Sequence, residues 1–322
     1  MVIYSGYCID REIKKRSSSG GAFTCVTDCL IKKNTNISIY GCIINSENKV
    51  IHVRVSDKDG RDQMCGSKYV SSYPGQVFTD VLKDINNGVY VVFSGTPCQI
   101  AGLKAFLINK KVDLTNLFLI DFICHGVGSN RFFDDYINFY EKKYKGKVVS
   151  CKFRAHSKPG KKQDMQLTFS NGKKYNAPST RNDWFYSAYH RKIILRPSCF
   201  CCKYASEERL SDITLADDWS HKEEDYSLLI FNSQQAMSLL PDLKEIMNLY
   251  ECIEEVNQNH LKKPCQKPED YDKFWDIYKK YGYLRAQTYL GNNNLKAKIK
   301  FWLVSIADKL NVRSIIKNKG KR

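Results

Sequence analysis

Apolar residues recur at helical spacing in some segments of this chain and form short β-rich runs in others. Phe23, Val26 and Leu30 follow a Ser/Gly-rich start at the spacing of one helix face. The elements expected over the first half are helix 19–33, strands 37–44 and 50–55, helix 78–85, strands 89–94 and 117–123, and helix 130–144. This alternation of strands and helices predicts a parallel α/β core.

The second half begins with a predicted hairpin. Residues 148–154 and 165–170 have strand patterns, and Ser170-Asn171-Gly172-Lys173 is a turn sequence whose central residues tolerate positive φ. From about Pro241 onwards the pattern predicts helix with a polar surface. The expected fold class is therefore α/β: a mixed, largely parallel sheet with flanking helices, an inserted β-hairpin and a helical C-terminal tail.

The tail has one apolar stripe at helical spacing with lysines opposite, made by Leu295, Ile299, Trp302, Leu303, Ile306 and Leu310. Such a helix packs on its own domain or lies on a membrane surface. No apolar run approaches the ~18 residues of a transmembrane span. The N-terminus has no basic region followed by a long apolar stretch, so we expect no signal peptide, no transmembrane segment and a cytoplasmic location.

The net charge of +17 favours acidic partners. Much of it lies in the hairpin region 158–174 and in the tail 296–322. These lysines and arginines form either a solvated surface or a basic docking face for an acidic protein such as a ferredoxin.

Thirteen cysteines are many for a cytosolic protein. In a reducing compartment they do not form a disulfide framework, so metal or redox use of a subset is indicated. Those at positions 25, 29, 42 and 151 lie among apolar residues and have the pattern of small core side chains.

Cys98 and Cys124 each follow a β-rich run and a small-residue turn. Thr96 is a good N-cap, Pro97 suits the first helical position, and Gln99 completes a capping box, so Cys98 is expected in the first turn of a helix. The helix dipole there favours a thiolate. One helix and one strand separate Cys98 from Cys124, and a right-handed crossover of that length brings neighbouring strand ends together.

A third segment, Arg196-Pro-Ser-Cys199-Phe-Cys201-Cys202, adds a pair of thiols. Both Cys199/Cys202 and Cys199/Cys201 are candidate pairs. With Cys98 and Cys124 the chain offers four thiolates, which suits one zinc ion or one 4Fe-4S cluster. Ligands dispersed over βα turns favour the cluster.

Three loops have residues suited to phosphate binding. Ser17-Ser18-Ser19-Gly20-Gly21 opens the first helix, Gly66-Ser67-Lys68-Tyr69 offers a cation and an aromatic ring, and Ser94-Gly95-Thr96 precedes Cys98. Together they suggest a dinucleotide, although none is the G-x-G-x-x-G fingerprint. Asp217-Asp218-Trp219 ends a short strand and either lines the site or closes a core.

At these residues the chain resembles the coenzyme F(420) hydrogenase/dehydrogenase beta-subunit family. The matching segments, in family order over about residues 1–230, are Ser17–Gly21, Gly66–Val70, Phe93–Leu103, Cys124-His125-Gly126, Cys199-x-x-Cys202 and Asp212-Ile-Thr. The family is described in two halves. The resemblance therefore divides the chain into three parts. Residues 1–88 would be the first half of the flavin-binding domain, and residues 89–240 would be the second half, which has the cluster cysteines. Residues 241–322 would be a basic helical extension.

The resemblance implies an oxidoreductase with FAD and a 4Fe-4S cluster. Cys98, Cys124, Cys199 and Cys202 would hold the cluster. FAD would contact the three loops, at Ser18, Ser19, Gly20, Gly21, Gly66, Ser67, Lys68, Tyr69, Ser94, Gly95, Thr96 and Gln99. His125 and Lys68 are candidates for proton transfer or for tuning the flavin. Electrons would pass between a ferredoxin-type donor and a two-electron acceptor, either a deazaflavin coenzyme or another small molecule.

The chain departs from the family pattern in three places. It lacks the N-terminal ferredoxin module of many relatives, so a separate ferredoxin or iron-sulfur subunit is the expected partner. Ala216-Asp-Asp-Trp-Ser220 replaces Gly-Asp-Phe-Trp-Gly, and Gly128 replaces a proline. The other functions considered are a non-catalytic accessory protein with the same fold and a zinc-stabilised nucleic-acid binder, although no nucleic-acid motif is present and no nucleic-acid partner is expected.

Overall fold

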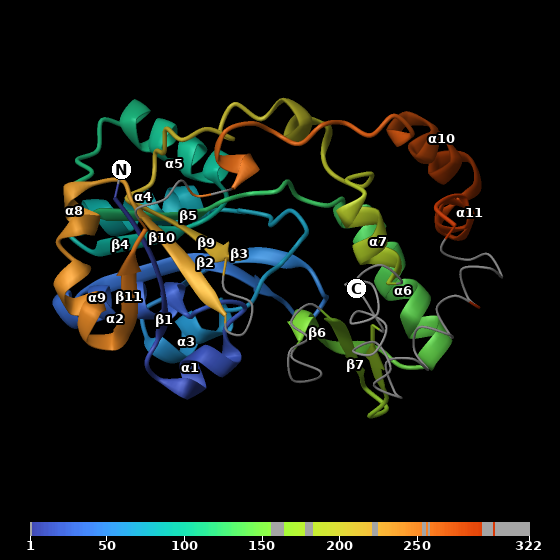
Figure 1. The fold of residues 1–322 in the computed structure, drawn as a ribbon, viewed down its shortest axis with the longest axis horizontal. Helices are drawn as coiled ribbons and strands as arrows, with labels where there is room; N and C mark the ends of the chain where they lie inside the picture. Colours follow the sequence, from blue (N-terminus) through green and yellow to red (C-terminus); the bar gives the residue numbers. More distant parts are fainter. Residues whose placement is uncertain are drawn as a thin grey trace, which may run out of the picture. The chain divides into compact units, whose positions relative to one another are not determined.

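The computed structural model describes residues 2–155, 164–177, 183–220, 225–252, 256, 258–291 and 299. It divides into two compact units (Figure 1). Unit 1 comprises residues 1–127 and 196–266, and unit 2 comprises residues 128–195 and 267–322. The predicted break near Gly88 lies inside unit 1.

Unit 1 contains an eight-stranded sheet in the order β11-β1-β10-β9-β5-β4-β2-β3. Its strands are β1 (Val2–Cys8), β2 (Ile37–Ile44), β3 (Val50–Val55), β4 (Tyr90–Ser94), β5 (Leu117–Phe122), β9 (Ile213–Asp218), β10 (Tyr226–Phe231) and β11 (Met247–Glu251). The central pairs β2–β4, β4–β5 and β5–β9 are parallel, whereas the pairs towards both edges are antiparallel. The mixed α/β sheet expected from the sequence is confirmed, and its core is parallel.

Helices cover both faces of this sheet. The helical elements of unit 1 are α1 (Arg11–Arg16), α2 (Ala22–Lys33), α3 (Lys58–Gln63), α4 (Val77–Asn86), α5 (Pro97–Asn109), η1 (Pro197–Cys201), α8 (Gln234–Met237), α9 (Leu240–Ile246) and η2 (Asn259–Leu261). Helices α4 and α5 bury Val81 and Leu103 against Val91 of β4 and its neighbours. Helices α2 and α9 bury Val26 and Leu243 in a second apolar layer.

The sequence pattern missed three neighbouring strands at one edge of the sheet, β11, β1 and β10. Strand β1 is the N-terminal segment, and β11 interrupts the stretch after Pro241 that was predicted to be helical. The antiparallel register of these two strands pairs Tyr4 with Glu251 and Cys8 with Met247. Both strands are short, and β11 mixes polar and apolar residues, so neither has a clear period of two.

Unit 2 combines a small sheet with aromatic-rich helices. Its elements are α6 (Asn130–Tyr144), β6 (Val148–Ala155), β7 (Asp164–Phe169), β8 (Lys174–Asn176), α7 (Trp184–His190), α10 (Tyr271–Tyr281) and α11 (Tyr283–Tyr289). The predicted hairpin joins β7 and β8, and of its two central residues only Gly172 has positive φ (+79°). The core of this unit packs rings such as Phe133, Phe153 and Phe185 against one another, stacked or edge to face, at centroid distances of 5.3–5.6 Å.

Two sequence predictions fall on parts of the chain outside this description. The lysines at 158–162 and the basic tail lie there, as does the apolar stripe 295–310 apart from Ile299. Among the described helices, none combines the length and apolar content of a membrane span.

Candidate functional site

Cys98 and Cys124 lie at the carboxyl ends of two adjacent parallel strands. Ser94 of β4 is in register with Ile120 of β5, so both strands end at the same edge of the sheet. Helix α5 begins with Thr96 as N-cap and Pro97 in its first turn, as predicted, and the Gln99 side chain accepts a hydrogen bond from the Thr96 N–H (3.0 Å). The Cys98 thiol in that turn is exposed and lies 3.1 Å from the Thr96 hydroxyl.

The segment with Cys199 and Cys202 is attached to the same region. The Arg196 N–H donates to the carbonyl of Val127 (3.1 Å), just after the Cys124-His125-Gly126 turn. The short helix η1 follows, and Cys199 is partly buried within it, whereas Cys201 at its end is exposed. Burial raises the pKa of Cys199, and the charges of Cys202 and Cys98 raise it further.

The charges of three other thiols act on Cys124. Burial raises the pKa of Cys124 to about 12, and the charges of Cys98, Cys199 and Cys202 add to this increase, against a hydrogen bond from the Gly126 backbone. Cys201 is not among these neighbours. All thirteen cysteines lie in the described part of the chain, and none forms a disulfide there.

These thiols are not arranged as a site for one metal ion. Among the described residues, no group of three or more His, Cys, Asp or Glu side chains has the arrangement of a one-ion metal site. The electrostatic effect of the other thiols on Cys124 does not require a one-ion site. The charge of a thiolate acts over a longer range than the length of a zinc–sulfur bond, which is about 2.3 Å.

The Ser/Gly loop is packed tightly against strands β1 and β10. The Ser19 hydroxyl donates to the carbonyl of Tyr226 (2.7 Å), and the Cys8 N–H donates to the carbonyl of Gly20 (2.7 Å). A Cβ on Gly20 would lie 2.4 Å from the carbonyl oxygen of Gly6, so only glycine fits there. Gly21 has φ of +90° and forms the N-cap of α2.

The Gly66–Tyr69 loop meets the Ser/Gly loop directly, because the Ser67 N–H donates to the Ser18 hydroxyl (2.9 Å). The ammonium group of Lys68 donates to the carbonyls of Met64 (2.7 Å), Cys65 (3.2 Å) and Gly66 (3.0 Å). Burial lowers the pKa of Lys68. In this arrangement Lys68 fixes the shape of its own loop.

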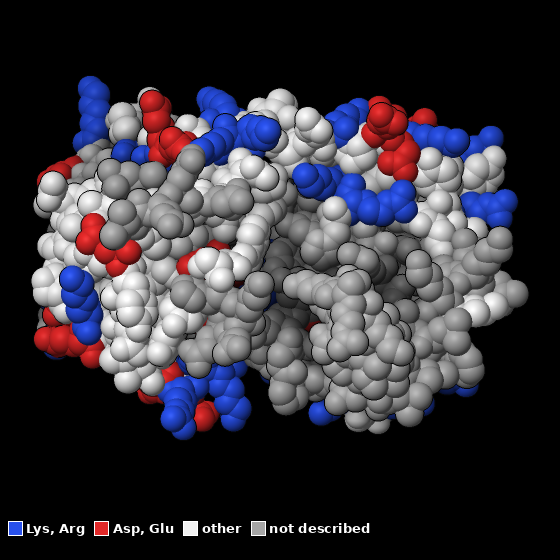
Figure 2. All heavy atoms as spheres, in the orientation of Figure 1, with Lys and Arg blue, Asp and Glu red and all other residues white. Residues whose placement is uncertain are grey.

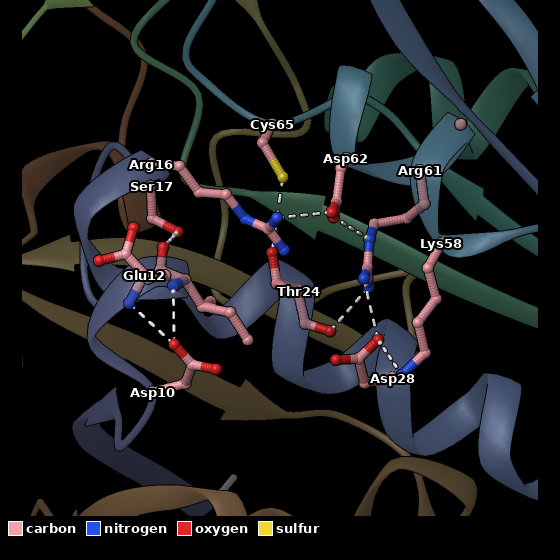
Figure 3. Close-up of polar contacts among 12 residues, drawn as sticks. Asp10, Glu12, Arg16, Ser17, Thr24, Asp28, Lys58, Arg61, Asp62 and Cys65 are labelled. Carbon is pink, nitrogen blue, oxygen red and sulfur yellow. Dashed lines mark hydrogen bonds and ion pairs between the residues drawn. The ribbon is translucent and has the colours of Figure 1, made fainter.

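A network of two arginines and their partners joins the helices next to these two loops (Figure 3). Arg61 of α3, with a 1% exposed side chain, donates to the Thr24 carbonyl (2.9 Å) and to Asp28 (2.8 Å), and it also bonds to Thr27. Arg16 forms an ion pair of 2.6 Å with Asp62. The network therefore joins the end of α1, helix α2 and helix α3.

The third loop is connected to the second by side-chain amides and hydroxyls. The Gln99 amide donates to the Ser72 hydroxyl (2.8 Å), and Arg196 donates to the Ser71 hydroxyl (3.2 Å). The segment after Lys68 therefore reaches both the helix start that has Cys98 and the segment that has Cys199.

His125 lies in a small cluster of rings that the sequence did not indicate. Its ring centroid is 4.3 Å from that of His260 and 5.7 Å from that of Trp219, whose side chain is 59% exposed. Gln258 donates to the carbonyl of Asp217 (2.9 Å) and fixes the segment before His260. Trp219 lines the region around His125 and does not close a core. No local motif marks His260, because it lies 135 residues along the chain from His125.

Fold and site together define a class: an α/β protein with four gathered thiols beside small-residue loops at the carboxyl edge of its sheet. Residues 89–255 match the family model for the C-terminal part of the coenzyme F420 hydrogenase/dehydrogenase beta subunit. The match covers more than half of the chain, and the protein belongs to this family.

A solved structure has the same fold. The chain is similar to one from a structure described as "Xenon derivatization of the F420-reducing [NiFe] hydrogenase complex from Methanosarcina barkeri". The TM-score is 0.55 at 14% sequence identity, over 89% of this chain and 90% of the other. No curated protein matches the sequence.

Proposed function

We propose that this protein is a flavin- and 4Fe-4S-dependent oxidoreductase that passes electrons between a ferredoxin-type donor and a two-electron acceptor. The observation that supports this function best is the electrostatic grouping of Cys98, Cys124, Cys199 and Cys202. Family membership supports the coarser statement that the chain is a redox protein.

The donor set fits an iron-sulfur cluster. Four thiols in one partly buried region repel one another once ionised, and several iron atoms between them remove that repulsion. Cys98, Cys124, Cys199 and Cys202 would hold the cluster, each through its thiolate.

The loops fit a dinucleotide such as FAD. Gly21 caps the 12-residue helix α2 without a side-chain hydrogen bond, and the N–H groups of the first turn and the helix dipole there favour phosphate. Ser18, Ser19, Gly21, Ser67 and Tyr69 belong to the two loops that meet at the Ser18 hydroxyl. The third loop, Ser94–Thr96, and Gln99 would complete the FAD site. The Lys68 ammonium already donates hydrogen bonds to three carbonyls. Lys68 would therefore act on FAD through its positive charge and not through a hydrogen bond.

When bound, the cluster would supply one-electron transfer and FAD would couple it to two-electron chemistry. His125 and His260 offer imidazole groups that hold or move a proton at this end of unit 1. The exposed indole of Trp219 offers a flat apolar surface for an acceptor ring. A deazaflavin coenzyme is one such acceptor, and the similar structure is that of an F420-reducing complex.

The donor in this proposal is a separate ferredoxin or iron-sulfur subunit, and the similar structure is itself a hydrogenase complex. The cytoplasmic location remains a prediction from the sequence.

Anaerobic purification followed by metal and flavin analysis tests this function. We expect a yellow-brown protein with about one flavin and about four irons per chain. A reconstituted protein without flavin or iron would support the accessory role, and zinc without flavin, together with salt-sensitive binding to DNA or RNA, would support the nucleic-acid binder. Either outcome would reject the proposed oxidoreductase.

A further inference from the structure

Unit 1 contains an ion pair that is almost completely removed from solvent. The side chains of Arg209 and Asp121 are 2% and 1% exposed, and their nearest nitrogen and oxygen atoms are 2.6 Å apart. The other carboxylate oxygen of Asp121 accepts a hydrogen bond from the Thr214 hydroxyl (2.6 Å). Buried ion pairs add little to stability compared with apolar residues of the same volume, so a positional role is the better reason for this one.

The partners of Arg209 come from three segments of the chain, one of which is β9, where the Thr214 hydroxyl accepts a hydrogen bond from Nε of Arg209 (3.2 Å). Its guanidinium donates to the carbonyls of Tyr204 (3.2 Å) and Ser206 (3.4 Å), just after Cys202. It also donates to the carbonyl of Phe122 (3.3 Å), two residues before Cys124. A single rigid side chain therefore joins the end of β5 to the loop that follows the Cys199/Cys202 pair.

We propose that Arg209, held by Asp121, is a positioning residue that sets the separation between Cys124 and the Cys199/Cys202 pair. This inference deepens the proposed function and rests on it for the identity of the cluster. The guanidinium fork bonds to several carbonyls and a carboxylate at fixed angles, which a lysine ammonium on a flexible stem does not reproduce. Outer-shell partners of this kind orient metal ligands and change metal affinity by about 10- to 100-fold.

Three variants and one matched control test the role. Arg209→Met removes the connection, Arg209→Lys keeps the charge without the fork, and Asp121→Asn keeps the shape without the charge. Arg61→Met is the control, because Arg61 is also a buried arginine of unit 1 with an aspartate partner, but its contacts lie around α2 and α3.

The readouts are iron loss to a chelator, the absorption and spin-resonance spectra of the cluster, flavin content and thermal unfolding. For Arg209→Met we expect iron loss about 10- to 100-fold faster than in the wild type with flavin retained. Arg209→Lys should keep its iron longer than Arg209→Met but show an altered cluster spectrum, and Asp121→Asn should fall between Arg209→Lys and the wild type. Arg61→Met should lower thermal stability and leave the cluster spectrum unchanged. Equal iron loss in Arg209→Met and Arg61→Met at equal loss of stability would overturn the inference.

A readout on iron-free protein separates this inference from the proposed function. Alkylation of Cys124 and Cys202, followed by mass spectrometry, should be faster in Arg209→Met than in the wild type and unchanged in Arg61→Met. Unchanged rates in both variants would contradict the positioning role. A wild-type protein that never binds iron would instead contradict the proposed function and leave the labelling result to decide the role of Arg209.

Discussion

Cys201 and Cys202 are adjacent in the chain but have different surroundings. The charge of Cys202 acts on Cys124 and on Cys199, whereas Cys201 is exposed, and its thiol lies 3.8 Å from the Ser198 carbonyl within its own helical turn. The sequence left either residue open as the fourth ligand, and we propose Cys202 because its charge acts on both Cys124 and Cys199.

We predict that Cys202→Ala abolishes the cluster and Cys201→Ala leaves it in place. The reason is that only the Cys202 thiol belongs to the group around Cys124. Iron content and the visible spectrum of anaerobically purified variants measure the difference, and the adjacent position makes each variant the control for the other. The reverse pattern, with iron lost only from Cys201→Ala, would assign the fourth ligand to Cys201.

His52 on β3 gives a prediction about pH. Burial lowers the pKa of His52, the charge of Lys68 adds to this, and a contact of 3.2 Å with the Ser94 carbonyl opposes it. In the unfolded chain the pKa is about 6.5, so below that pH the unfolded state takes up the proton first. The contribution of neutral His52 to stability is therefore present above about pH 6.5 and decreases as the pH falls towards the folded pKa.

We expect His52→Phe to unfold with a weaker dependence on pH just below about pH 6.5 than the wild type. Phenylalanine keeps a ring against Phe93, on which His52 stacks at 5.3 Å, but has no proton to gain. Each unit by which the folded pKa is lowered corresponds to about 1.4 kcal/mol of unfolding free energy. Denaturant midpoints of both proteins on either side of pH 6.5 give this quantity, and parallel curves would contradict the prediction.

At the scale of elements, helix α7 depends on one buried carboxylate. Asp183 is fully buried, and it accepts hydrogen bonds from the Tyr136 hydroxyl (2.8 Å), the Tyr175 hydroxyl (2.9 Å) and the Tyr186 N–H (2.8 Å). It therefore caps α7 and joins it to α6 and β8. Burial raises the pKa of Asp183, and the hydrogen bonds from Tyr186, Tyr136 and Tyr175 oppose that increase.

Replacement of Asp183 by alanine should destabilise unit 2 by about 3 kcal/mol or more, because three buried donors lose their acceptor at about 1–3 kcal/mol each. Chemical unfolding followed by tryptophan fluorescence measures the loss, since Trp184 is the next residue. Asp183→Asn keeps one acceptor oxygen and should lose less. Equal stability of the alanine and wild-type proteins would show that other groups replace the carboxylate.

The elements that position the candidate site were the ones that the sequence predicted well. The capping residues Thr96 and Gln99 and the apolar run before Cys124 are local signals, and they fixed the start of α5 and the end of β5. Arg209, His260 and strand β11 act through contacts between segments far apart in the chain, which no local pattern encodes. The sequence also did not indicate that the ammonium group of Lys68 donates hydrogen bonds to backbone carbonyls. Those hydrogen bonds depend on how the loop turns back towards the end of α3.

At the scale of the whole molecule, the net charge of +17 is the property that matters for a protein donor. On the face drawn in Figure 2, the described Lys and Arg side chains lie in several groups with Asp and Glu side chains between them. The attraction of an acidic donor is therefore expected to come from the summed field of the chain, which acts at longer range than any single ion pair.

If the summed charge of the chain attracts the donor, the rate of electron transfer from the donor should depend on the salt concentration. Between ionic strengths of about 0.01 M and 1 M the screening length falls from about 30 Å to about 3 Å, so the long-range attraction is lost. The second-order rate constant for reduction by an acidic ferredoxin should fall by about 10-fold or more over this range, since steering raises association rates by about 10- to 1000-fold. Reduction by a small neutral reagent, measured on the same protein, should stay constant. A ferredoxin rate that does not change with salt, or that rises, would mean that contacts other than charge select the donor.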